Sequence, residues 1–140
     1  MAAPIFAQLA SALTGTRLSL HVLSAAVWVG GQLVLAGLVP TARTLGDEAP
    51  RRLARAFSRL SWPAYGLLVA TGVWNIAAVV HGQSTTWQVI LGVKLAVVAL
   101  SGLSAWLHTR ARTRRGLAVW GGVTGVSAVA ALVLGVFLAG

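Results

Sequence analysis

The chain has no cysteine and almost no acidic residues: among its 140 residues the only carboxylate side chains are Asp47 and Glu48. The absence of cysteine excludes disulfides, CxxC redox motifs, thiolate zinc sites and cysteine-ligated iron–sulfur clusters. The only methionine is Met1. Because no carboxylate falls within an apolar run, hydrolytic or nucleophilic catalysis inside a span is not expected.

Charge of either sign is sparse. Charged residues make up 9% of the chain, apolar residues 57%, and the mean hydropathy is +0.82. A soluble domain carries about a quarter charged residues, so the composition predicts a membrane protein. The length allows about four helical crossings of ~20 residues with short connections. That leaves no room for a separate soluble catalytic domain.

Four apolar runs follow one another along the chain, at about 18–39, 63–80, 87–107 and 117–139. A helix that rises 1.5 Å per residue needs about this length to cross ~30 Å of hydrocarbon. We therefore predict an all-α polytopic membrane protein, a four-transmembrane-helix bundle that occupies residues 1–140 as a single domain.

The basic residues predict the orientation of this bundle. Nine of the eleven Lys and Arg lie in the connections after the first and third runs, namely Arg43, Arg51, Arg52, Arg55, Arg59, Arg110, Arg112, Arg114 and Arg115. By the positive-inside rule both connections are cytoplasmic, and both termini are outside. Topology thus accounts for the net charge of +9, and a nucleic-acid partner is not expected. We expect a bilayer partner and, from the excess of Arg over Lys, a bacterial inner-membrane location.

The first basic connection is amphipathic. Leu53, Phe57 and Leu60 share one helical face, opposite the arginines of the same connection. This pattern predicts a short cytoplasmic interfacial helix that leads into the second span and lies against anionic lipid headgroups.

Polar residues inside spans are costly and often functional. From the outer ends of their spans, His21 lies ~5 Å deep, Asn75 ~8 Å and Lys94 ~10 Å, and His81 follows the second span at the rim. We expect the three deeper groups to meet in a pocket that opens to the outside. Purely structural roles are the alternatives: snorkelling for Lys94, and helix bridging for His21 and Asn75.

The first span contains the pattern H-x6-W-x-G-G, formed by His21, Trp28, Gly30 and Gly31. It resembles the opening of the copper resistance D (CopD) domain, and the Trp87 to Lys94 stretch of the third span is similar to the same family. The resemblance covers roughly residues 18–115. It implies a four-helix membrane module involved in copper uptake or tolerance. A distant relative of that family, the HemJ-type protoporphyrinogen oxidase, carries a histidine in its first span and a lysine in its third, so the resemblance implies a functional pair of His21 and Lys94.

Three functions stay open on these observations. Copper handling ranks first because the resemblance supports it. The metal would be copper(II), bound from outside without catalysis, with His21 and His81 as its ligands. Copper(I) is less suitable because it prefers thiolates and thioethers, which are absent from the spans. The close alternative is haem b or another porphyrin, for electron transfer or porphyrinogen oxidation, with His21 as axial ligand, Lys94 on a propionate, and Trp28 and Asn75 lining the pocket. The third is an accessory structural subunit of a larger membrane complex or homo-oligomer.

Overall fold

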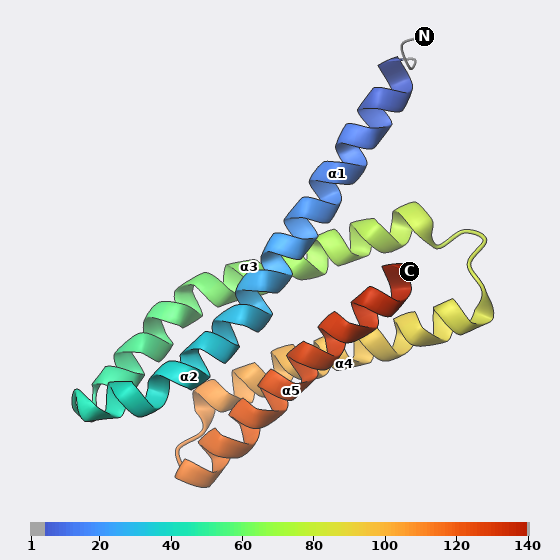
Figure 1. The fold of residues 1–140 in the computed structure, drawn as a ribbon. Coiled ribbons are helices and arrows are strands. Elements are labelled where there is room, and N and C mark those ends of the chain that lie inside the picture. The colour runs from blue at the N-terminus through green and yellow to red at the C-terminus, as the bar shows by residue number, and fades with distance from the viewer. Residues whose placement is uncertain (1–4, 140) are drawn as a thin grey trace.

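The computed structural model describes the backbone of residues 5–139 and the side chains of residues 11–139, and this part of the chain is helical apart from short connections (Figure 1). The elements in chain order are α1 (Ile5–Ala25), the π-helical segment η1 (Ala26–Gly30), α2 (Gly31–Thr44), α3 (Ala49–Val79), α4 (Thr85–Arg110) and α5 (Arg114–Ala139). Four helices are long and apolar enough to cross a membrane, the first of them made of α1, η1 and α2 in continuity. The predicted all-α architecture with four spans is confirmed.

The helices form two antiparallel hairpins (Figure 1). In the first, α1 and α2 pack against α3; in the second, α4 packs against α5 along its length. The hairpins meet where η1 contacts α5. We call the end with the α3–α4 connection and the end of α5 the outer end, and the end with the other two connections the inner end.

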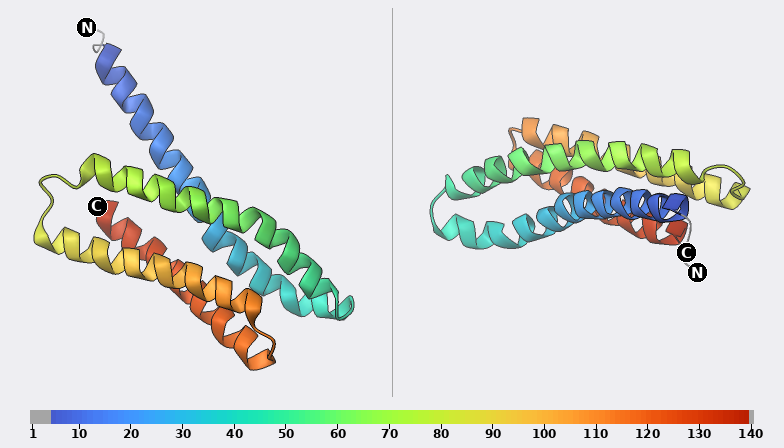
Figure 2. Two further views of the ribbon diagram at one scale, coloured as in Figure 1. Left: turned by 180° about the vertical axis from the view of Figure 1, so that it is seen from behind. Right: turned by 90° about the horizontal axis from the view of Figure 1, so that it is seen from above.

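The helices are longer than the apolar runs from which they were predicted. Pro40 lies inside α2 and Pro63 inside α3, although proline removes a backbone hydrogen bond from a helix interior. Neighbouring groups in a membrane bundle can compensate for that loss. The first span therefore does not end at Pro40 but continues to Thr44, and α3 is bent along its length (Figure 2).

The predicted helix that leads into the second span is present, but it is not a short helix of its own. Residues 49–62 form the first turns of α3, in one piece with the second span. Pro50 stands in the first turn, where proline is tolerated, and the following Arg, Leu and Ala residues favour a helix, so nothing interrupts it before Pro63.

The distribution of polar side chains is the reverse of that in a soluble protein. The most buried side chains are small and polar, with Ser101 and Ser104 fully buried, whereas many large apolar side chains on all helices are exposed. Without water outside, apolar side chains gain little from burial, and small residues let helices approach closely. The exposed apolar surface is consistent with contact to a lipid bilayer.

Hydroxyl groups join α4 to α5. Thr124 Oγ1 lies 3.0 Å from Ser104 Oγ, and Ser101 Oγ donates to the Thr124 carbonyl oxygen at 3.3 Å. At the outer end, the Trp87 indole donates to the Leu138 carbonyl oxygen at 3.2 Å. These bonds fix the register of the second hairpin and thereby the height of Lys94.

Trp28 is the centre of the contact between the two hairpins. It lies in η1, is 3% exposed, and donates from Nε1 to Ser101 Oγ on α4 at 3.0 Å. Its ring lies 4.5 Å from that of Tyr65 on α3, and the Tyr65 hydroxyl donates to the Val98 carbonyl oxygen at 2.9 Å. This junction lies directly below His21 and holds the first and second hairpins together there.

Candidate functional site

His21 lies on α1 two turns before Trp28 and faces α3. Its Nδ1 is 2.9 Å from Thr71 Oγ1. The Thr71 hydroxyl has a single hydrogen, which it donates to the Leu67 carbonyl oxygen at 2.7 Å. With the hydrogen on that carbonyl, Oγ1 accepts from His21, and this assignment puts the proton of the neutral ring on Nδ1. This leaves the lone pair of Nε2 available to a metal or another electron-pair acceptor.

This arrangement resembles the way metal-binding histidines are usually held. A ligating imidazole donates its other N–H to a neighbouring acceptor, which fixes both the tautomer and the ring orientation. Thr71 is 3% exposed, so the hydroxyl that holds His21 is protected. His21 itself is half-buried, and Nε2 is therefore oriented by a buried partner without being enclosed.

Lys94 lies on α4 in the second hairpin, and its side chain contacts α5. A Cβ atom added to Gly135 on α5 would lie 2.9 Å from Lys94 Nζ, so the side chain extends over the space that this glycine leaves. Lys94 is half-buried. The lysine thus lies against α5, as an interior role requires, rather than extending freely along the lipid face.

Arg17 is the residue that the sequence interpretation missed. It lies one helical turn before His21 on the same face of α1, is only 7% exposed, and its Nε is buried without a hydrogen-bond partner. Arg17 and His21 are four residues apart in the sequence, and this spacing predicts that both side chains lie on the same face of the helix.

Asn75 lies on α3 one turn beyond Thr71, toward the outer end. Its Oδ1 is buried and has no hydrogen-bond partner. The predicted depth of Asn75 places it close to the level of the His21–Thr71 pair. The side chain does not bridge α3 to another helix through that oxygen, which leaves its polar capacity open.

Two predicted site residues lie elsewhere. Trp28 is enclosed at the junction of the hairpins with its only N–H used, so it supports the site from below instead of lining an open pocket. His81 is exposed and follows the end of α3, which extends about 12 Å beyond Thr71 at 1.5 Å per residue. Ligands of one copper ion lie ~2 Å from it, so the structure does not bring His81 to His21.

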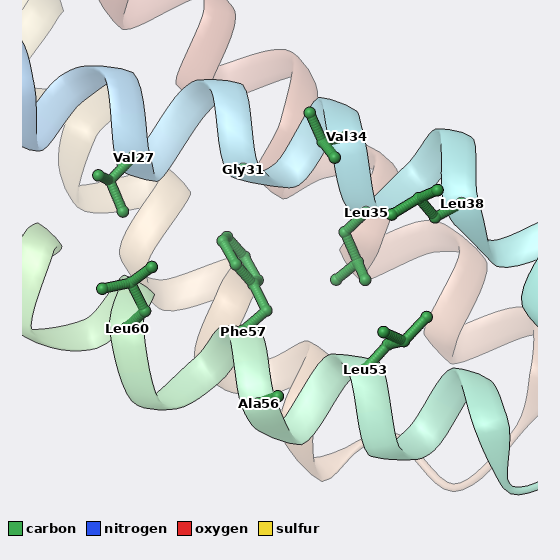
Figure 3. A pocket seen from close by; sticks show the side chains of 9 residues that line it. All are labelled: Val27, Gly31, Val34, Leu35, Leu38, Leu53, Ala56, Phe57 and Leu60. Atoms are coloured by element: carbon green, nitrogen blue, oxygen red, sulfur yellow. The ribbon is translucent and has the colours of Figure 1, made fainter.

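We found no second polar site among the described residues. His108, at the inner end, has its Nδ1 2.9 Å from the Leu117 carbonyl oxygen. Within residues 11–139 no group of three or more His, Cys, Asp or Glu side chains could hold a metal ion. A groove between α2 and α3 near the inner end is lined by apolar side chains, with Phe57 extending toward Gly31 (Figure 3). It suits an acyl chain and includes no residue of the outer site.

The described site therefore consists of one oriented imidazole and two cationic side chains, with an amide nearby, in the outer half of the bundle. His21 and Arg17 come from α1, Asn75 from α3, and Lys94 from α4. No family model, no curated protein and no solved structure matches the chain. Its chemistry therefore has to be argued from these side chains.

Proposed function

We propose that this chain is a multi-pass protein of the bacterial inner membrane, of the copper resistance D type, whose outer-facing intramembrane site binds haem b or a related porphyrin. His21 would hold the iron through Nε2, and Lys94 would pair with a propionate. The observation that carries the proposal is the His21–Thr71 hydrogen bond: with Thr71 donating to Leu67, His21 donates from Nδ1 and keeps the lone pair of Nε2.

The charge of the site favours this ligand over a copper ion. Arg17 and Lys94 are cationic, and the only two acidic residues of the chain lie at the inner end. A site without carboxylates and with two cations nearby repels a metal cation but attracts the carboxylates of a porphyrin. Copper(II) would also need further ligands, and His81 is too far along the chain from His21 to supply one.

The residues present fit a haem with one protein ligand. Haem iron is commonly held by a single histidine, and its propionates pair with basic side chains. When bound, haem would supply one-electron chemistry. The residues of this chain would orient it: His21 fixes the iron, Thr71 fixes His21, and Lys94 fixes one edge of the ring.

Analysis of the purified protein tests this proposal. The wild type, His21→Ala and His81→Ala are produced in cells supplied with both haem precursor and copper, and haem and copper contents per chain are measured. We expect haem in the wild type and in His81→Ala, and its loss in His21→Ala. Stoichiometric copper that both variants lose would instead support the copper site, and a wild type without a Soret band would reject the porphyrin.

A further inference from the structure

Arg17 is a buried cation that forms no ion pair with an acidic side chain of residues 11–139. Its side chain is 93% buried, counting from its exposure of 7%, and Nε has no hydrogen-bond partner. Burial of an unpaired charge is strongly unfavourable, and a guanidinium in a protein does not lose its proton. A second group that is not part of the described chain is therefore needed beside it.

No acidic side chain of this protein can be that group. Asp47 and Glu48 lie in the connection between α2 and α3, at the inner end, and Glu48 is paired with Arg51 at 2.7 Å. From Arg17 to the end of α2 the first span continues for about 40 Å at 1.5 Å per residue. No carboxylate side chain of the described residues can therefore be the counter-charge, and an anionic group of a bound molecule would supply it.

The pairing of α1 with α3 places Asn75, a second residue with an unsatisfied polar atom, one turn outward from the His21–Thr71 pair, as Arg17 is. His21 bonds to Thr71 across the two antiparallel helices. One turn outward on each helix leads from His21 to Arg17 and from Thr71 to Asn75. Both residues have a buried polar atom without a partner, and an amide can turn to present its NH2 group as a donor.

We propose that Arg17 and Asn75 form an anion subsite next to His21, with Arg17 as its principal donor. Its ligand is an anionic oxygen group that accepts charge-assisted bonds from the guanidinium. Two molecules could carry that group: the ligand at His21, through a second carboxylate, or a phospholipid of the outer leaflet, through its phosphate. The first source rests on the proposed function; the subsite itself does not.

Titration of the purified apoprotein with haem, and with the dimethyl ester of haem, tests the carboxylate source. The ester has no free carboxylates. We expect Arg17→Gln to weaken haem binding by roughly tenfold or more. Arg17→Lys keeps the charge but loses the planar set of donors of the guanidinium, so its affinity for haem should lie between those of Arg17→Gln and the wild type. Binding of the ester should be the same in all three proteins. Arg59→Gln, the same change at an exposed inner arginine, is the matched control and should bind haem as the wild type does.

Native mass spectrometry tests the phosphate source. Each protein is mixed with phosphatidylglycerol or with diacylglycerol, which lacks the phosphate. Retention of phosphatidylglycerol alone, lost in Arg17→Gln but not in Arg59→Gln, would support the subsite with lipid as its ligand, even if the wild type bound no haem and the proposed function failed. Equal behaviour of Arg17→Gln and Arg59→Gln in both experiments would overturn the subsite.

Discussion

At the scale of single residues, the site depends on one hydroxyl. Thr71 donates to its own helix and accepts from His21, so it fixes which imidazole nitrogen remains free. A valine has the same shape but no hydroxyl, and a serine keeps the hydroxyl without the methyl group. These two substitutions separate the hydrogen bond from the packing.

We predict that Thr71→Val weakens haem binding about tenfold or more, because loss of the partner of a ligating histidine typically costs 10–100-fold in affinity. Thr71→Ser should bind within a few-fold of the wild type. A titration that follows the Soret band measures both. Equal affinity in Thr71→Val and the wild type would show that the hydroxyl does not orient His21.

Part of this site could be predicted from single residues, and part could not. Depth within the spans predicted that His21, Asn75 and Lys94 gather in the outer half. The sequence could not show that Thr71 holds His21, because this depends on the register between two helices distant in sequence. Arg17 was missed because the apolar run begins at Leu18, one residue later. The predicted pairing with His81 needed a distance that the sequence does not contain.

At the scale of helices, hydropathy predicted the number and approximate position of the spans but not their ends. The predicted runs end before Pro40 and begin at Pro63, yet both prolines lie inside helices. The π-helical turn at Ala26–Gly30 was not predicted, since hydropathy does not depend on the backbone hydrogen-bond pattern. Such turns often occur at functional sites, and here one carries Trp28 into the junction of the two hairpins.

The close approach of α3 to α4 requires a glycine. A Cβ atom at Gly102 would collide with the Tyr65 hydroxyl, which donates to the Val98 carbonyl oxygen. We predict that Gly102→Val lowers the free energy of unfolding by about 1 to 3 kcal/mol, the usual cost of overpacking. Gly92→Val, on the same helix with open space beside it, is the matched control.

The measurement for this pair is thermal unfolding in detergent. The melting temperature of Gly102→Val should fall clearly below that of Gly92→Val. If the two variants melted together, the contact between Tyr65 and α4 would not hold the hairpins in place.

At the scale of the whole molecule, the arginines should decide the orientation in the membrane. All nine arginines after Arg17 lie in or next to the two inner connections, and the site lies in the opposite half. If the positive-inside rule holds, the site opens to the side away from the cytoplasm.

The absence of cysteine makes this orientation easy to test. We predict that Ser84→Cys, in the outer connection, reacts with a membrane-impermeant maleimide in intact cells with the outer membrane opened. Thr113→Cys, in an inner connection, should react only after the inner membrane is made permeable. The opposite labelling pattern would place the site on the cytoplasmic side.

The central claim is that one imidazole, that of His21, holds the ligand of this bundle. Resonance Raman spectroscopy of the ferrous haem-reconstituted protein measures this most directly, through the iron–histidine stretching band. We predict that the band is present in the wild type, His81→Ala and His108→Ala, and absent in His21→Ala. Persistence of the band in His21→Ala would contradict the account.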